Sequence, residues 1–288
     1  MKKYDEKIGK YPTFSGLVRL FEEEGAASLS LSSQKRYQSI LGNFRFFFTD
    51  YYKDIRKLKD FTPDMIEHYK TYRKEQAQAR TVNAELVILR KLFRLAQRRG
   101  WISRDPTSGL KNVKVQTRAR LRYFSQEEAR RFLAHCDAFW YPVFFTLLHT
   151  GLRKAELENL LWEQIDMDRR HICLKDREVP FSEELQEILQ EQMYRAKGSA
   201  YVFPDEKGGR LFQNRLYKNF KSLLRKSSMA DVRGLNVLRH TFAIRLLEKG
   251  SGLFFVRNVL GLTRLNSLAL YEDFVLEKKQ SELTDIHA

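Results

Sequence analysis

The sequence has little cysteine and lacks several common motifs, and each absence excludes a class of protein. Its two cysteines, Cys136 and Cys173, are too few for a disulfide framework and lack the C-x-x-C spacing of a zinc site. No run of about 18 apolar residues could span a membrane, and no apolar stretch behind the charged N-terminus marks a secretory signal. Without a G-x-x-x-x-G-K-S/T or G-x-G-x-x-G motif, no nucleotide site is indicated. We therefore expect a cytoplasmic protein in a reducing environment.

Positive charge is in excess. The 288 residues include 52 Lys and Arg against 36 Asp and Glu, a formal net charge of +16. Residues 1–117 hold 24 of the basic and 13 of the acidic side chains, so the N-terminal part is the more cationic. Such a charge predicts a polyanionic partner, either nucleic acid or an anionic membrane surface. The length and a hydrophobic content of 43% predict two domains.

Residues 1–110 repeat apolar side chains at helical spacing, which predicts an all-helical N-terminal domain. The expected helices are Phe14–Glu24, Ser33–Tyr52, one that opens at Pro63 behind the N-cap Thr62, and Thr81–Arg99, which stops at Gly100. The aromatic run at 44–48 is interpreted as helix core rather than a base-stacking surface.

A basic segment, residues 111–122, follows this domain. It is predicted to link the two domains and to lie along a phosphate backbone, with an ordinary solvated linker as the alternative. The candidate DNA contacts in and before the linker are Arg90, Arg94, Lys111, Lys114, Arg118 and Arg120.

Residues 123–274 mix helical and strand patterns, and residues 275–288 form a tail. A small antiparallel sheet of two or three strands is expected from Ile165, His171–Leu174 and Glu178–Phe181. The predicted fold class is therefore mainly α with a small antiparallel β-sheet, in a helical domain followed by a mixed α+β domain. The expected helices are Ser125–Cys136 with a capping box, the apolar segment Trp140–Thr150, Arg153–Leu161, Glu183–Arg195, Asn214–Ser227, Val237–Lys249, Leu253–Leu260 and Ser267–Asp273.

Two short basic clusters are candidates for phosphate chemistry without a metal. Arg153 follows Gly151 at the start of a helix, where the helix N-terminus also favours an anion, and Glu156 lies on the same helical face. Arg239 and His240 stand together at the start of another helix. Two guanidinium groups can clamp one phosphodiester. Either cluster alone is more often a solvated helix end than a phosphate site.

Three segments, in this order and spacing, resemble the signature boxes of the tyrosine recombinases, which include the phage integrases and the Xer-type enzymes. They are TGLRKAELENL at 150–160, NVLRHTFAIRLLEKG at 236–250 and VLGLTRLNSLALY at 259–271. Residues 81–110 also look like the end of that family's helical core-binding domain. The resemblance implies that Arg153 and Arg239 are the catalytic arginines, supported by Glu156, that His240 assists, and that Tyr271 is the nucleophile.

The family's catalytic lysine lies on a β-hairpin, where Lys175 is the best match and Arg177 is the alternative. Two positions depart from the family pattern. Asn236 stands where histidine is usual, and Leu262 stands where histidine or tryptophan is usual. Asparagine cannot exchange a proton near neutral pH and leucine cannot donate a hydrogen bond, so each change lowers the rate by about 10²-fold if that group acts in the transition state.

The resemblance implies a site-specific recombinase in which Tyr271 attacks a phosphodiester to give a 3′-phosphotyrosyl link, without metal, ATP or other cofactor. Its partner would be a double-stranded recombination site bound by a homo-tetramer, alone or with a second recombinase or accessory protein, on the nucleoid and away from membranes. A tail helix would dock on a neighbouring protomer, with a frayed chain end as the alternative. The alternatives are a catalytically weak DNA-binding homologue, a type IB topoisomerase-like enzyme, and an unrelated helical protein that binds RNA or an anionic membrane.

Overall fold

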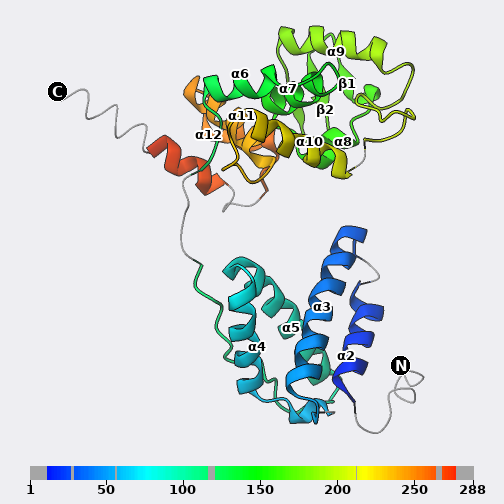
Figure 1. Ribbon diagram of the computed structural model, residues 1–288, viewed down its shortest axis with the longest axis vertical. Coiled ribbons are helices and arrows are strands. Elements are labelled where there is room, and N and C mark those ends of the chain that lie inside the picture. Colours follow the sequence, from blue (N-terminus) through cyan, green and yellow to red (C-terminus); the bar gives the residue numbers. More distant parts are fainter. Residues whose placement is uncertain are drawn as a thin grey trace, which may run out of the picture. The chain divides into compact units, whose positions relative to one another are not determined.

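A computed structural model describes residues 12–26, 29–55, 57–115, 121–211, 213–263 and 268–276. The chain forms two compact units, Met1–Thr117 and Arg118–Ala288 (Figure 1). The described part is mainly helical with one three-stranded antiparallel sheet, so the predicted fold class is confirmed. None of the described helices is both long and apolar enough to cross a bilayer.

The described part of the first unit is helical throughout. Its elements are α2 (Phe14–Phe21), the π turn η1 (Glu22–Ala26), α3 (Leu31–Tyr51), the 3₁₀ turn η2 (Leu58–Asp60), α4 (Pro63–Gln76) and α5 (Ala79–Arg98). Pro63 occupies the first turn of α4, and α5 gives way to a left-handed Gly100, as the sequence predicts. The helices close on a core in which Phe44 and Phe47 are fully buried, whereas Phe46 is 61% exposed.

A buried ionic network ties three of these helices together. The Glu85 carboxylate of α5 is 1% exposed and accepts hydrogen bonds from the Tyr69 hydroxyl at 2.7 Å and from Arg73 of α4 at 2.7 and 2.8 Å. Asn43 of α3 donates to it at 3.3 Å. A buried carboxylate needs such partners, because without them its desolvation is very costly.

The predicted linker is described in part. Asn83 of α5 exchanges two hydrogen bonds with the backbone of Val113, at 2.8 and 2.9 Å, so the chain is held against the first unit as far as Val113. Phe124 is buried in the second unit, and its N–H donates to the Thr241 hydroxyl at 2.8 Å. Arg118 and Arg120 lie outside the described residues.

The second unit places its helices around the largely apolar α7, which packs against α9 and α11 (Figure 1). Its elements are α6 (Gln126–Ala134), α7 (Trp140–Thr150), α8 (Lys154–Glu158), η3 (Trp162–Gln164), β1 (Ile165–Asp166), β2 (His171–Cys173), β3 (Glu178–Pro180), α9 (Glu183–Arg195), α10 (Gln213–Lys226), α11 (Asn236–Glu248) and α12 (Leu253–Leu260). A last helical stretch covers 268–276; the rest of the predicted tail lies outside the described residues.

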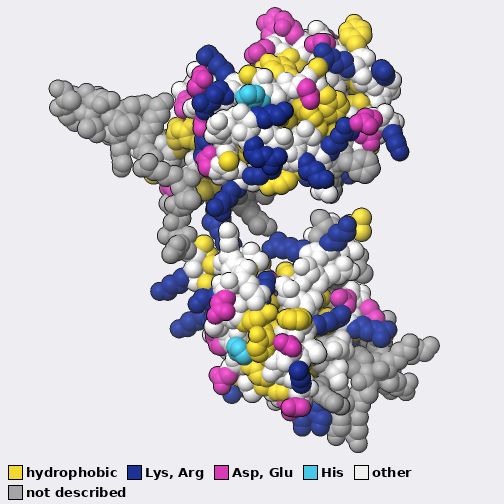
Figure 2. Space-filling model, in the orientation of Figure 1, with side chains coloured by type: hydrophobic (Ala, Val, Ile, Leu, Met, Phe, Trp, Pro, Cys, Tyr) yellow, Lys and Arg dark blue, Asp and Glu magenta, His cyan; other side chains and the backbone are white. Residues whose placement is uncertain are grey.

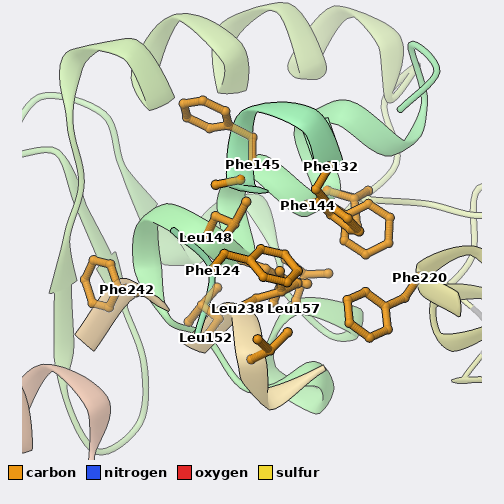
Figure 3. Close-up of a cluster of buried hydrophobic side chains, with 14 of the residues drawn as sticks. Phe124, Phe132, Phe144, Phe145, Leu148, Leu152, Leu157, Phe220, Leu238 and Phe242 are labelled. Atoms are coloured by element: carbon orange, nitrogen blue, oxygen red, sulfur yellow. The ribbon is translucent and has the colours of Figure 1, made fainter. Parts of the chain in front are cut away.

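Aromatic side chains from α6, α7 and α10 fill the centre of this unit (Figure 3). The Phe132 ring lies 5.1 Å from that of Phe144 and 5.8 Å from that of Phe220, both edge to face. Such buried aromatic pairs contribute about 0.5–1.5 kcal/mol beyond their burial. This core fixes α7 and hence the turn that follows it.

Helix α8 is shorter than the sequence predicts. The expected helix ran to Leu161, but α8 ends at Glu158 because the next residues pair with a distant strand segment. Val202 donates to the Leu160 carbonyl at 2.9 Å, and Trp162 donates to the Ala200 carbonyl at 3.0 Å. This pairing takes the backbone groups that a longer helix would need.

Candidate active site

The C-terminal end of α12 gathers three arginines. Gly261 ends the helix in the left-handed conformation, at φ 60°, and a helix end leaves its last carbonyls without helical partners. Three consecutive carbonyls each accept a hydrogen bond from a different guanidinium: Val259 from Arg177 at 2.7 Å, Leu260 from Arg239, and Gly261 from Arg153 at 2.6 Å. The negative end of the helix dipole favours such cations.

Arg153 stands directly before α8 and is held from two sides. Its guanidinium donates to Glu156 at 2.5 Å, and its backbone N–H donates to the same carboxylate at 2.6 Å. Burial alone would raise the pKa of Glu156, but hydrogen bonds from Arg177 and Arg153 outweigh it and lower that pKa to about 2. The carboxylate is therefore ionised at neutral pH. The Arg153 side chain stays 43% exposed and accessible to an anion.

Arg239 lies on the first turn of α11 and is buried. Besides Leu260, its guanidinium donates to the Gly151 carbonyl at 2.6 Å. Gly151 is left-handed, and a Cβ there would lie 2.6 Å from a Phe242 ring carbon, so only glycine brings this carbonyl so close. Burial and then the charge of Arg153 lower the pKa of Arg239 to about 10. The side chain still carries its charge at neutral pH.

Tyr271 lies on the last described helix, 2% exposed, and its hydroxyl is 2.9 Å from Nδ1 of His240. Burial raises the pKa of the phenol to about 12, against the lowering effect of the Arg239 charge. Burial and Arg239 lower the pKa of His240 to about 4. A protonated phenol therefore faces a neutral imidazole near pH 7, and the phenol donates the hydrogen bond in the tautomer that carries its proton on Nε2.

The hairpin between β2 and β3 separates its two cations. Lys175 is exposed in the turn, and among the described residues it has no hydrogen bond or ion pair. Arg177 turns inward, with a side chain 5% exposed, and donates to Glu156 at 2.7 and 3.0 Å. Arg177 lies two residues before the buried Val179, and residues two apart in a strand share a face, so the sequence indicates its inward direction.

The two substituted positions do not join this network. Asn236 is exposed as the first residue of α11. Leu262 is half-buried against the apolar core, and its carbonyl accepts from Arg257 at 3.3 Å. Within the described residues, no group of His, Cys, Asp and Glu is arranged to hold a metal ion.

The N-terminal candidates for DNA contact differ in whether their side chains are held by other residues of the chain. Arg90 is tied to the Leu110 carbonyl at 2.7 Å and to the Asn112 side chain at 3.0 Å, so it anchors the exit segment. The other described candidates, Arg94, Lys111 and Lys114, are exposed.

Comparison with known proteins defines the class. Residues 122–275 match the phage integrase family, and residues 13–115 match the phage integrase SAM-like domain. The chain therefore belongs to the phage integrase family, that is, to the tyrosine recombinases.

Individual relatives are distant in sequence. The chain is 27% identical to the integrase of Escherichia phage 186 over 72% of this chain and 60% of that protein, and 28% identical to the integrase of Haemophilus phage HP1 over 67% and 56%. It is 23% identical to a XerC-like tyrosine recombinase of Caldanaerobacter subterraneus over 76% of this chain and 68% of that protein. The match thus spans less than two thirds of the two phage integrases.

Solved structures share the fold. A lambda integrase dimer bound to a COC′ core site has a TM-score of 0.74 at 15% identity, over 91% of this chain and 77% of that one. The Tn1549 transposon integrase in complex with a circular intermediate DNA has a TM-score of 0.75 at 17% identity, over 94% and 99%.

Proposed function

We propose that this protein is a site-specific DNA recombinase that cuts and rejoins strands through a covalent bond to Tyr271. The observation that carries the proposal is the pairing of a buried phenol with His240, within the field of Arg239 and beside the three arginines on the end of α12. A phenol, a proton acceptor and fixed guanidinium charge are what phosphoryl transfer to tyrosine requires.

Residues of this chain can supply the nucleophile and both proton transfers of the cleavage step. The Tyr271 oxygen forms a bond to the scissile phosphorus, its proton passes to His240, and the bond from phosphorus to the 5′ oxygen breaks. Lys175 gives a proton to that oxygen, which leaves as a 5′ hydroxyl. Arg153 and Arg239 stabilise the charge on the five-coordinate phosphorus, a term worth about 10²–10³ in rate for each donor. The 5′ hydroxyl of a partner strand then attacks the phosphotyrosine and releases the phenol.

Charge supports a DNA substrate. Helix α10 carries five basic side chains and no acidic one, namely Arg215, Lys218, Lys221, Arg225 and Lys226. Figure 2 shows Lys and Arg side chains across the visible face of each unit. Such surfaces bind the phosphate backbone with steep salt dependence.

We infer that the protein works as a homo-tetramer on two DNA sites, on the nucleoid in the cytoplasm. Solved relatives include a lambda integrase tetramer bound to a Holliday junction. Light scattering with site DNA, at stoichiometric protein, tests this assembly.

The experiment that tests the chemistry has two stages. DNA that stays on the protein after denaturation is first sequenced from cells, which gives the site. A nicked duplex of that site then traps the intermediate, and peptide mass spectrometry locates the adduct. We expect DNA on Tyr271, none with Tyr271→Phe, and a normal amount with Tyr194→Phe, whose tyrosine is 85% exposed on α9. An adduct on another residue, or strand exchange without one, contradicts the proposal, whereas binding without any cleavage favours a DNA-binding homologue.

A further inference from the structure

We infer that Arg177 is a positioning residue for phosphoryl transfer, acting through Glu156 to hold Arg153 ready for the scissile phosphate. The inference rests on the proposed function. It concerns a side chain that does not itself bind the phosphate, because all three of its guanidinium nitrogens donate to protein acceptors and two of them are bound to the Glu156 carboxylate. Arg239, by contrast, donates from two nitrogens to backbone carbonyls and leaves its charge to the phosphate.

Every branch of the Arg177 guanidinium is used. Its Nε donates to the Val259 carbonyl at 2.7 Å, and its two terminal nitrogens donate to Glu156 at 3.0 and 2.7 Å. One terminal nitrogen also donates to Asp176 at 3.0 Å. These bidentate hydrogen bonds fix the Glu156 carboxylate in position and orientation, which a single contact cannot do.

Glu156 in turn fixes the position of Arg153. Its two oxygens, each held by Arg177, also accept from the Arg153 guanidinium at 2.5 Å and from the Arg153 backbone at 2.6 Å. Arg153 and Arg177 are therefore joined twice, through the carboxylate and through α12, whose end receives both guanidiniums. Displacing Arg177 loosens both supports of Arg153 together.

Charge gives Arg177 a second effect. A carboxylate bound to Arg153 alone would cancel much of the charge that the phosphate needs. Arg177 shares the carboxylate, so Arg153, Arg177 and Glu156 together keep a net positive charge next to Arg239. The other carboxylate on Arg177, Asp176, is 55% exposed and screened by water, so the site retains an excess of positive charge for a dianionic transition state.

The backbone is shaped to admit this side chain. Gly261 is left-handed, and a Cβ there would lie 2.9 Å from the Arg177 Cδ and 2.9 Å from a terminal nitrogen. Glycine at this turn both closes α12 and leaves room for Arg177. The same inward packing removes Arg177 as a donor to the leaving oxygen and leaves that role to Lys175.

The test compares three variants on the nicked duplex and on the same duplex with a methylphosphonate at the scissile position. Arg177→Met removes the charge and the two-nitrogen contact with Glu156, whereas Arg177→Lys keeps the charge without that contact. Arg169→Gln is the control, since Arg169 lies in the turn between β1 and β2 of the same sheet with its side chain 59% exposed. The readouts are the rate of covalent complex formation at saturating protein, the DNA affinity in a Tyr271→Phe background, and the unfolding midpoint.

We expect Arg177→Met to slow cleavage about 100-fold and Arg177→Lys at least about 10-fold, since small misplacements of a catalytic group cost this much. Affinity should stay within about threefold, and Arg169→Gln should react normally. A methylphosphonate lacks one negative charge, so the Arg177→Met deficit should shrink to less than about 10-fold there. If Arg177→Met lowers the unfolding midpoint, the deficits of Arg177→Lys on the normal and the methylphosphonate duplex are compared instead.

An equal deficit on both substrates indicates a merely structural role and overturns the inference, as does cleavage by Arg177→Met at the normal rate. No covalent complex with the unsubstituted protein overturns the proposed function, and the inference with it. The two failures are therefore distinguishable.

Discussion

The Tyr271 hydroxyl lies 2.9 Å from Nδ1 of His240, and the two groups have opposite shifts in pKa. The pKa of the phenol rises to about 12, and that of the imidazole falls to about 4. The phenol therefore cannot ionise near neutral pH by itself, while the imidazole is neutral and has one nitrogen that can accept a proton. This relation defines what His240 contributes to the proposed reaction.

His240→Ala should lower the rate of covalent complex formation at pH 7 by about 10²-fold, the usual contribution of general base catalysis. Its rate should rise with pH toward the phenol pKa, because hydroxide must then remove the proton. In the unsubstituted protein the rate should stay level at neutral pH and fall only as pH approaches the His240 pKa of about 4. Single-turnover cleavage of the nicked duplex between pH 4 and 9 measures both profiles.

His240→Asn separates positioning from proton transfer. The asparagine amide oxygen can accept the phenol hydrogen bond where Nδ1 does, but it takes up no proton. This variant should bind DNA normally and keep the slow, rising profile of His240→Ala. A level profile with either variant would exclude His240 as the proton acceptor.

A second histidine should make stability depend on pH. The His149 ring of α7 lies 3.8 Å from the Phe145 ring, centroid to centroid, at a tilt of 50°. Its Nδ1 is buried without a partner among the described residues, and burial lowers its pKa to about 4. An unfolded histidine titrates near 6.5, so between these values the unfolded state binds more protons. The free energy of unfolding should have its highest value, as far as His149 sets it, above about pH 6.5, and it should fall as pH drops toward 4.

His149→Phe should reduce this loss, because the group that must take up a proton is gone. Urea unfolding at pH 5 and at pH 7 measures the difference for each protein. His135→Gln is the control, since His135 is exposed at the end of α6. An unchanged pH dependence in His149→Phe would exclude His149 as a source.

The buried network of the first unit should be costly to break. Glu85→Gln leaves Arg73, whose side chain is 13% exposed, without its counter-charge, so we expect a loss of about 3–5 kcal/mol. Hydrogen exchange of α5 peptides in the full chain reports this loss. The exposed Glu75→Gln on α4 should stay within about 0.5 kcal/mol, and equal protection in both variants would refute the expectation.

Local patterns predicted much of this molecule. The capping box of Ser125 and Glu128 opens α6, and Gly100 ends α5, because both signals act within one helical turn. Position at a helix start made Arg153, Arg239 and His240 candidates, and the resemblance to the tyrosine recombinases added Tyr271 and gave each residue its role.

Long-range relations could not be read from the sequence. The end of α8 depends on pairing between Leu160 and Val202, which no local propensity encodes. The three carbonyls at the end of α12 meet arginines far away in sequence, so this shared support emerges only when α8, the hairpin and α11 pack together. The sequence offers Arg177 as the alternative cation of the hairpin. Its place two residues before the buried Val179, on the same face of the strand, indicates an inward side chain.

Lys175 should act on the leaving oxygen alone. It is exposed at the tip of the hairpin, whereas Arg177 is held by Glu156 and Val259. Lys175→Ala should therefore slow cleavage of a normal duplex by about 10²-fold or more, because the 5′ oxygen leaves without a proton. DNA affinity should change little, since one exposed cation among many contributes little to phosphate binding.

A duplex with sulfur in place of the scissile 5′ oxygen makes the prediction sharp. A thiolate leaves without protonation, because the pKa of a thiol is far below that of an alcohol. The deficit of Lys175→Ala should then nearly vanish, while that of Arg177→Met should persist, since Arg177 supports charge at phosphorus. Rates of covalent complex formation with both variants on both duplexes measure this. If sulfur restores Arg177→Met and leaves Lys175→Ala slow, the two cations of the hairpin have the opposite roles.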